Sequence, residues 1–587
     1  MHTIRRSVLC TDPVFLRQAP ITVGDGEFIK IVEAAADLDD YRCGKFFVPE
    51  QLSDRFRQEP SFENADSLTQ TLSSFESAQT DQCAKDDLLS CNSRPHGLLR
   101  LRDPAVLPPW ARGIREMLDG LAKQDFTTKH TSPVYRLCEC GSRYGLERLQ
   151  SQISPEIRNL ICAKAKKSLQ IDLRRLLARV LRPCFTLEQE ASRLAYDALR
   201  LYRHATDRIV ETTHLRGTPF DQLCFTFKMF PVLARLWSQL ISQWCDHIAE
   251  VLLRLMADRI ALSHAFFGGQ PTDKIIDLLP GLSDLHNEGR SVALIQFESG
   301  SVIYKPRPGD GEEEWLCLLR WMNSQSFRPR LRAARILRRK DYCWMERVRS
   351  EPCKDEAAAR RFYLRVGGLL AAAYLLKMVD CHRDNLIACG EYPILVDAET
   401  LCHETKTQSP VDALWGTGFL PSSRRGASYQ YRSSALGKTT SGKHTPHLAG
   451  RPLSAGDFEA EIINGFQRGW RCLLGTRGRR AAFVRRLQRL RRRERRWIYW
   501  STRNYHVIRR ASIQPAALRS GIERHFILAR LCKRKAVPNS VLHSEIGALE
   551  RLDIPYLTRE IMTDPIHCED NAALTKIGVE LRRAVHL

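Results

Sequence analysis

The sequence predicts an α+β protein in which short strands carry the chemistry and long helices form most of the remaining chain. Three observations lead to this prediction. From Leu146 to about Phe267, apolar residues recur three and four positions apart, which is typical of amphipathic helices. From Ile276 to Arg307 they form short runs separated by polar turns, which indicates strands. A third stretch, Val379 to Thr400, combines two short strands with closely spaced polar side chains.

Composition places the chain among globular proteins. Its 587 residues, 43% hydrophobic and 27% charged, suffice for two to four domains with a large core. The N-terminus lacks the apolar core of a signal peptide, and the longest apolar run, Val366 to Val379, is too short to cross a bilayer. The 19 cysteines show no zinc-site spacing, so we expect reduced thiols, a cytoplasmic location and no membrane span.

The Arg-dense segment from Arg477 to Arg496 supplies much of the net charge of +23. Its apolar residues recur at near-helical spacing, which predicts a surface helix with one apolar face: Phe483, Leu487, Leu490 and Trp497. Such a run could attract nucleic acid, nucleotide phosphates or an acidic peptide, or it could be a solvated helix face.

The stretch Val379 to Thr400 is the most informative part of the chain. It has the pattern D-x-H-x-x-N followed by D-x-E, formed by Asp380, His382, Asn385, Asp397 and Glu399. Phosphoryl transfer needs such a set, because one carboxylate orients a hydroxyl while an Asn and an Asp hold Mg²⁺. A protein kinase arranges these groups in the same order with different flanking residues. The alternative is a hairpin with a polar rim, since Asp, His and Asn are ordinary turn residues.

A second hairpin precedes this stretch. The runs SVALIQF and SVIYKPR predict two strands, the second of which carries Lys305. A Lys on a strand ahead of a metal loop is how kinases hold nucleotide phosphates. A polar turn with Gly289 and Arg290 comes just before the hairpin and could cover the nucleotide. Taken alone, Lys305 would more simply be a strand-end lysine that reaches water, but its order relative to Asp380 favours the phosphate role.

Together these stretches resemble the dehydratase domain of LanM-type (class II) lanthipeptide synthetases. The similar stretches follow the family order from about Leu176 to Leu557: LLARVLRPCFTLE, FPVLARLW, RLMADRIAL, DLHNEGRSV, VIYKPR, YCWMERV, DCHRDNLIACGEYPILVDAETL, GTGFLP and ERLDIPYL. The resemblance implies an α+β fold with a lipid-kinase-like bilobal catalytic core and extensive helical additions.

The domain boundaries follow from the patterns and the resemblance together. Residues 1–141 would be a variable N-terminal region, partly disordered because Gln58 to Arg94 is rich in Ser, Gln, Asp and Glu. Residues 142–275 would form a helical scaffold and 276–350 a kinase-like N-lobe. Residues 351–470 would form the C-lobe with the catalytic loop and an activation-like segment, and 471–587 a helical region with an elimination motif.

The resemblance also implies an activity. Family members phosphorylate Ser and Thr of a ribosomal precursor peptide with ATP and Mg²⁺, then eliminate the phosphate in the same site to leave dehydroalanine or dehydrobutyrine. Carried over by motif, Lys305 would contact the ATP phosphates, and Asp380 would be the catalytic aspartate with His382 beside it. Asn385 and Asp397 would hold Mg²⁺, and Glu399 would support that site. Asp284 and His286 match a D-x-H that lines the shared active site.

The chain departs from the family pattern at the elimination motif, R-x-x-x-R-x-T. The corresponding residues are His506, Arg510 and Ser512, so an imidazole replaces a guanidinium. A guanidinium can hold the oxygens of a departing phosphate with two parallel hydrogen bonds, whereas an imidazole is a weaker, pH-dependent substitute. Arg503 or Arg509 could compensate in a shifted register.

Two further departures concern the turn and the end of the chain. Ser283 and Leu285 replace a Gly and a Pro of the family's Gly-Asp-Pro-His. No zinc cyclase is expected within the chain, so ring closure would need a separate cyclase, unless this is a truncated gene product.

Three functions follow from these patterns. The first is a lanthipeptide dehydratase, a peptide kinase and phosphate lyase whose partners would be a leader-bearing precursor peptide and a cyclase. The second is a peptide Ser/Thr kinase with impaired elimination. The third is a non-catalytic basic protein that binds peptide or nucleic acid. The complete set Lys305, Asp380, Asn385 and Asp397 argues against the third, and we expect no specific nucleic-acid ligand.

Overall fold

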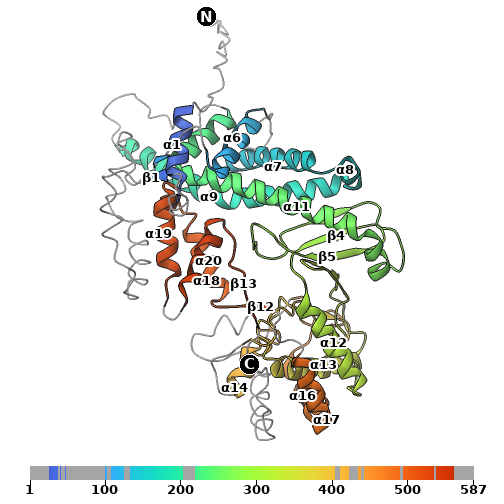
Figure 1. Cartoon of the computed structure of the whole chain (residues 1–587). Coiled ribbons are helices and arrows are strands. Elements are labelled where there is room, and N and C mark those ends of the chain that lie inside the picture. The colour runs from blue at the N-terminus through green and yellow to red at the C-terminus, as the bar shows by residue number, and fades with distance from the viewer. Residues whose placement is uncertain are drawn as a thin grey trace, which may run out of the picture. The chain divides into compact units, whose positions relative to one another are not determined.

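The computed structural model describes residues 25–37, 40, 46–47, 100–101, 107–123, 132–201, 218–403, 410–421, 434–437, 442–488, 494–534 and 537–560. The chain forms two compact units (Figure 1). The first comprises residues 1–144, 177–239 and 511–527, and the second residues 145–176, 240–510 and 528–587. The domain boundaries expected from the sequence stay predictions, and the stretch Gln58 to Arg94 lies outside the described residues.

The first unit is mainly helical. Thr218 begins one of its helices with a capping box, because its hydroxyl accepts from the Asp221 N–H while the Asp221 carboxylate accepts from the Thr218 N–H at 2.8 Å. Trp237 is fully buried, and Arg235 pairs with Asp37 at 2.9 Å. The unit contains α1 (Asp25–Ala35), α6 (Pro109–Ala122), α10 (Pro219–Met229), parts of α7 (Pro133–Gln152), α9 (Ala163–Leu201), α11 (Pro231–Phe266) and α19 (Gly521–Cys532), the short helix η3 (Pro515–Leu518), and the strands β1 (Phe46–Phe47) and β2 (Arg100–Leu101).

The second unit contains a five-stranded antiparallel sheet in the order β3-β4-β5-β7-β6. The predicted hairpin is confirmed, since Ala293 pairs with Tyr304 and Gln296 with Ser301. The stretch YCWMERV contains β7, which lies between β5 and β6. The strands are β3 (Asp277–Leu279), β4 (Ala293–Gln296), β5 (Ser301–Lys305), β6 (Ile336–Arg338) and β7 (Cys343–Glu346).

Helix α12 (Asp310–Ser324) follows β5, and the buried helix α13 (Glu356–Leu375) packs along α16 (Glu459–Leu474) (Figure 1). Glycines allow this close approach, because a Cβ on Gly465 would lie 1.9 Å from the Leu364 carbonyl oxygen. After α13, β8 (Leu386–Cys389) and β9 (Tyr392–Leu395) pair antiparallel, as predicted. This unit also contains α8 (Pro155–Leu160), α14 (Pro410–Gly416), β10 (His447–Leu448), β11 (Arg451–Pro452), η2 (Ala455–Phe458), α18 (Thr502–Ala511) and α20 (Asn539–Glu550).

The Arg-dense segment is not one helix, which corrects the prediction. Helix α17 (Arg477–Gln488) buries Phe483 and Leu487 as expected, but β12 (Glu494–Trp497) is a strand that pairs with β13 (Leu557–Glu560). Trp497 lies opposite Leu557, and Leu490 lies outside the described residues. Cross-strand pairing and an ion pair between Arg496 and Glu399 outweigh the helical spacing here.

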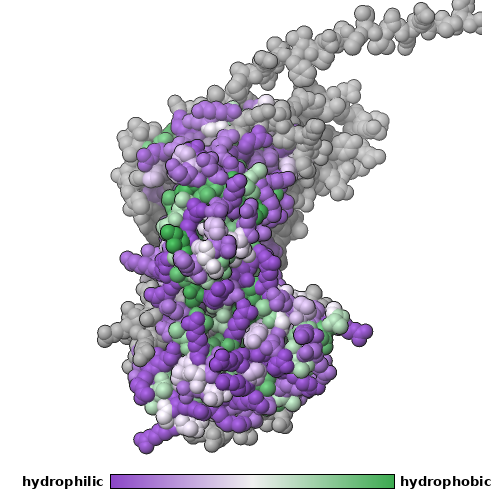
Figure 2. All heavy atoms as spheres, turned by 90° about the vertical axis from the view of Figure 1, so that its right-hand side faces the viewer, coloured by the Kyte–Doolittle hydropathy of each residue, from purple (hydrophilic) through white to green (hydrophobic). Residues whose placement is uncertain are grey.

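One face of the described residues is largely polar. Figure 2 shows one face on which hydrophilic side chains cover most of the area, with smaller apolar patches between them. Within the described ranges, no helix combines the length and apolar character that a bilayer span requires. The cysteines of the described residues are free thiols, and most of them are buried.

Candidate active site

Lys305, at the end of β5, forms a buried ion pair with the first turn of α12. Its Nζ donates to Glu312 Oε1 at 2.9 Å and to the Val396 carbonyl at 2.7 Å. The side chains of Lys305 and Glu312 are 6% and 4% exposed, so the alternative of a strand-end lysine that reaches water is wrong. Burial lowers the pKa of Lys305, but the Asp397 and Glu312 carboxylates outweigh burial and raise it, so the amine stays charged.

Two glycines shape the connection between β5 and α12. Gly309 precedes the helix with a φ of +74°, in the left-handed region that favours glycine. A Cβ on Gly311 would lie 2.1 Å from the Ala398 carbonyl oxygen. These two glycines therefore let the first turn of α12, which carries Glu312, approach Ala398 near the end of the stretch Val379 to Thr400.

Arg307 joins three acidic side chains. Its Nη2 lies 2.6 Å from Asp397 Oδ1 and its Nε 2.9 Å from Glu399 Oε2, and the guanidinium also contacts both oxygens of Glu312. Sequence reasoning missed Arg307 and Glu312. The available signal was a strand Lys with an acidic residue in the first turn of the next helix, since kinases pair a strand Lys with a helix Glu.

The loop between α13 and β8 brings Asp380, His382 and Asn385 together. Asp380 has a φ of +66°, which few residues other than Gly, Asn and Asp adopt. Its Oδ1 lies 3.2 Å from His382 Nε2, and Asn385 Nδ2 donates to the Asp380 carbonyl at 2.9 Å. Burial lowers the pKa of His382, but the hydrogen bond and charge of Asp380 raise it overall. The Val396 N–H donates to the Asn385 carbonyl, which ties the loop to the strand that leads to Asp397.

Asp397 and Asn385 fit a divalent cation. Burial raises the pKa of Asp397 to about 6, and the Glu399 charge adds to this while Lys305 and Arg307 oppose it. Burial is the main cause of this shift, and a bound cation would favour the ionised form of the carboxylate. Asn385 commits its amide nitrogen to the loop, so its oxygen is the atom left for a ligand. No cluster of three His, Cys, Asp or Glu side chains in the described ranges could hold a metal. A cation here would therefore also need substrate or water oxygens, as Mg²⁺ sites commonly do.

Glu399 has three partners that the motif did not reveal, and its role beside a metal stays a prediction. Its Oε1 pairs with Arg496, and its Oε2 accepts from Arg307 at 2.9 Å and from the Tyr556 hydroxyl at 3.2 Å. Burial raises the pKa of Glu399, but Arg307 and Arg496 outweigh it and lower the value to about 2. The carboxylate stays ionised, and it anchors two arginines at this site.

Asp284 lies beside two side chains of α18. Its Oδ2 is 3.1 Å from His506 Nε2, and its Oδ1 is 3.8 Å from Arg509 Nη2. Arg509 also donates to His506 Nδ1 at 2.9 Å, so in the neutral imidazole the proton is on Nε2, facing Asp284. Burial raises the pKa of Asp284, but the His506 hydrogen bond and the charges of His506 and Arg509 lower it below its usual value.

His286 is held by the segment that precedes β13. Its Nδ1 lies 2.7 Å from the Ile554 carbonyl, which can only accept, so Nδ1 carries a proton. Burial and the charge of Arg496 lower the pKa of His286, which favours the neutral ring. The Asp553 carboxylate accepts from the backbone N–H groups of Glu288 and Gly289 at 2.8 and 3.1 Å. The segment Asp553–Tyr556 therefore fixes the turn that carries Asp284 and His286.

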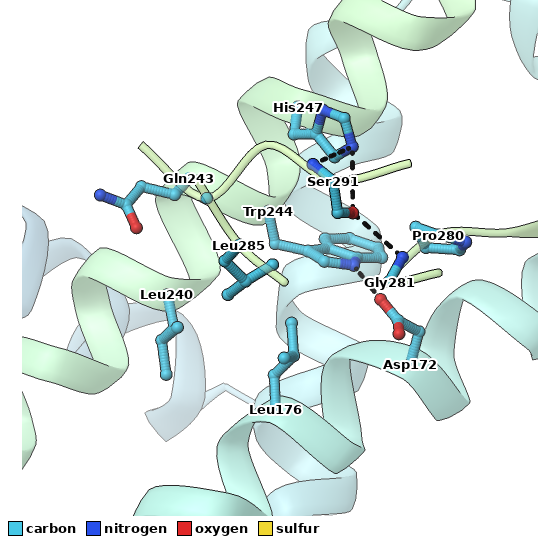
Figure 3. Close-up of a pocket in the computed structure, with 11 residues that line it drawn as sticks. Asp172, Leu176, Leu240, Gln243, Trp244, His247, Pro280, Gly281, Leu285 and Ser291 are labelled. Atoms are coloured by element: carbon cyan, nitrogen blue, oxygen red, sulfur yellow. Dashed lines mark hydrogen bonds between the residues drawn. The ribbon is translucent and has the colours of Figure 1, made fainter. Parts of the chain in front are cut away.

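A small cavity of about 20 Å³ lies against the same turn (Figure 3), with room for about one water molecule. Ser291 N–H donates to His247 Nε2 at 3.3 Å, and Gly281 N–H donates to Ser291 Oγ at 3.0 Å. Burial lowers the pKa of His247 to about 3, so the ring is a neutral acceptor. The cavity is too small for a substrate. Its side chains instead fix both ends of the turn.

Three further predicted residues are Arg290, Arg510 and Ser512. Arg290 donates to Glu250 Oε2 of α11 at 2.9 Å and to the Asn287 carbonyl at 2.6 Å. Arg510 is exposed, and the Arg that contacts His506 and Asp284 is Arg509. Ser512 belongs to the first unit, where it is buried and its carbonyl accepts from Arg524 at 3.1 Å. The roles of all three stay predictions.

The remaining predicted residues lie in one continuous network of the second unit. Tyr556 contacts Glu399 on one side and the ring of His286 on the other. The Val396 N–H donates to the Asn385 carbonyl and the Val396 carbonyl accepts from Lys305, so the backbone joins the polar loop to the Lys305–Glu312 pair. The network thus extends from the Lys305–Glu312 pair, through the carboxylates, to the group formed by Asp284, His506 and Arg509.

The part of the chain that contains this network is similar to known proteins. The sequence profile of a family described as "Domain of unknown function (DUF4135)" matches residues 230–446 and 435–560. The lacticin 481/lactococcin biosynthesis protein LcnDR2 of Lactococcus lactis subsp. lactis is 24% identical over 351 residues, which cover 50% of this chain and 37% of that protein. The chain therefore spans well under half the length of this relative. Because the two profile matches together cover more than half of the chain, it belongs to the DUF4135 family, which is associated with LanM-type lanthipeptide synthetases.

Proposed function

We propose that the chain is a lanthipeptide dehydratase, which phosphorylates Ser and Thr of a ribosomal precursor peptide with ATP and Mg²⁺ and then eliminates the phosphate. The observation that carries the proposal is the buried Lys305–Glu312 pair beside Asp397. A basic binding protein gains nothing from burying two charges in this way, because removing them from water is costly. A kinase needs this pair to hold nucleotide phosphates next to a metal-binding Asp.

In the first half-reaction, Lys305 would contact the α- and β-phosphates of ATP. Asp380 would orient the Ser or Thr hydroxyl, and His382 would hold the Asp380 carboxylate through their 3.2 Å contact. Asn385 and Asp397 would hold Mg²⁺, which when bound neutralises charge on the transferred phosphoryl group. The proposed kinase-like, bilobal core is supported by the order of these parts: a strand Lys, a helix Glu, a polar loop, and an Asp after the next hairpin.

In the second half-reaction, a base takes the α-proton of the phosphorylated residue. The C–H electron pair forms the double bond, and phosphate leaves with the electrons of the Cβ–O bond. Neutral His286, whose Nδ1 is bonded to Ile554, offers Nε2 as that base. Arg509 offers a permanent guanidinium beside His506, and a guanidinium suits the departing phosphate. Arg509 therefore supports elimination despite the imidazole at position 506.

A peptide kinase that no longer eliminates phosphate is the second candidate, because His506 stands where the family has an Arg. It predicts that phosphopeptide accumulates and that His506→Arg restores dehydration. Efficient dehydration by the unaltered chain would exclude it.

The test is the intact mass of a candidate precursor peptide co-expressed with the chain, with Asp380→Ala as control. Loss of one water per modified residue, absent with Asp380→Ala, is the expected result. Gain of phosphoryl groups without loss of water would support the kinase-only candidate. If none of the candidate precursor peptides changes mass and the purified chain does not bind ATP, the proposal is wrong.

A further inference from the structure

Tyr556 lies between the two halves of the proposed active site. Its hydroxyl donates to Glu399 Oε2 at 3.2 Å. Its ring packs against that of His286 in an edge-to-face arrangement, with ring centroids 5.5 Å apart. The Arg496 guanidinium lies over the ring at 5.3 Å from its centroid. Each contact is to a different residue of the network.

The position of Tyr556 is fixed from both sides along the chain. Before it, the Asp553 carboxylate and the Ile554 backbone bind the turn that carries Asp284 and His286. After it, β13 pairs with β12, the strand that carries Arg496 (Figure 1). Burial and the charge of Glu399 raise the pKa of the phenol, so it keeps its proton and remains a donor.

We propose that Tyr556 is a positioning residue with two separable parts: its hydroxyl holds Glu399 for phosphorylation, and its ring holds His286 for elimination. This inference rests on the proposed function. Glu399 anchors Arg307, which also contacts Asp397 and Glu312, so a loosened Glu399 disturbs the nucleotide side. The ring borders His286, so its loss disturbs the elimination side.

Two substitutions separate the parts. Tyr556→Phe removes the hydroxyl and keeps the ring, whereas Tyr556→Leu removes both. Tyr342→Phe is the matched control, because the Tyr342 hydroxyl, just before β7, also donates to a buried carboxylate, that of Asp258 in α11, at 2.8 Å. Each full-length variant would be given the precursor peptide with Mg-ATP. Separately, it would be given the same peptide made with one phosphoserine, so that phosphorylation and elimination are timed independently.

For Tyr556→Phe we expect the kcat of phosphorylation to fall about tenfold, because the substitution removes one hydrogen bond to a charged group. Elimination from the phosphoserine peptide should stay within about twofold of the unaltered chain. Tyr556→Leu should slow both steps about tenfold or more, and Tyr342→Phe should slow neither.

Three results would overturn the inference. In the first, Tyr556→Phe behaves like the Tyr342→Phe control. In the second, Tyr556→Phe and Tyr556→Leu slow both steps equally, with lowered thermal midpoints, which indicates only a structural role. In the third, the unaltered chain modifies neither peptide, so the proposed function itself fails. Activity of the unaltered chain distinguishes this last case from the first two.

Discussion

At the scale of single residues, Glu312 is the counter-charge on which the buried cations depend. It contacts both Lys305 and Arg307 and is 4% exposed. Glu312→Gln would leave two buried cations short of one anion, so we expect a loss of about 3 kcal/mol in unfolding free energy and a large loss of phosphorylation. Chemical denaturation measures the first effect.

The neighbouring Glu313→Gln is the control for that experiment. The Glu313 side chain is 42% exposed and makes a long surface contact with Arg338. Its removal should change stability by less than about 1 kcal/mol. Equal losses of unfolding free energy for the two variants would show that the buried Lys305–Glu312 pair stabilises the fold no more than a surface contact does.

Arg509 is the residue that tests whether elimination survives His506. We expect the Arg509→Gln variant to phosphorylate the precursor but to eliminate phosphate about a hundredfold more slowly. Phosphorylated peptides should therefore accumulate. Intact mass over time measures this. Arg503→Gln, an exposed change on the same helix, should dehydrate like the unaltered chain. If Arg510→Gln stops elimination and Arg509→Gln does not, the motif register is right and the role assigned to Arg509 is wrong.

His247 should make stability depend on pH. Its folded pKa is about 3, below the ordinary value of 6.5, so the unfolded chain binds the proton more strongly. The contribution of the neutral ring is complete above pH 6.5 and is lost progressively as pH falls toward 3. Between pH 7.5 and 5 this group alone should remove about 2 kcal/mol of stability.

The measurement is denaturant unfolding at both pH values. His247→Gln should lose less stability on acidification than the unaltered chain, because Gln does not titrate. His264→Gln, an exposed change on the same helix α11, should keep the original dependence. An unchanged pH dependence in His247→Gln would contradict the assignment.

At the scale of elements, the contact between α13 and α16 depends on glycine. A Cβ on Gly465 would meet the Leu364 carbonyl oxygen at 1.9 Å, and one on Gly367 would meet the Ile462 carbonyl oxygen at 2.0 Å. Gly465→Ala should therefore lower stability by about 2–3 kcal/mol, because two backbones must separate. Gly478→Ala in α17, with nothing within 4 Å, should be neutral or stabilising. Thermal unfolding of both variants checks this, and a tolerated Gly465→Ala would contradict the close packing.

Local patterns predicted the elements well where the pattern itself dictates structure. The β4–β5 and β8–β9 hairpins follow from short apolar runs separated by polar turns. The prediction failed at Trp497, because partner strand β13 lies some sixty residues further along the chain. Helical spacing cannot reveal such a distant partner, and cross-strand pairing decided the structure of this segment.

At the scale of the whole molecule, the sequence predicts Lys305, Asp380 and Asp397 as site residues, because each belongs to a short motif and the motifs follow in a kinase-like order. The residues that were missed, such as Arg307 and Tyr556, act only through partners distant in sequence. Tyr556 reaches Glu399 across 157 positions. The contact of Arg509 with Asp284 likewise depends on which face of α18 meets Asp284, and that is a property of tertiary packing.

In the proposed function, one network of side chains serves two successive reactions. The most direct measurement is the intact mass of the precursor peptide after incubation with Mg-ATP and either Asp284→Asn or Asp397→Asn. The proposed roles predict that Asp397→Asn leaves the peptide unchanged, whereas Asp284→Asn adds phosphoryl groups and fails to remove them. If both variants leave the peptide unmodified, or if Asp284→Asn dehydrates it as the unaltered chain does, the division of the site into these two halves is contradicted.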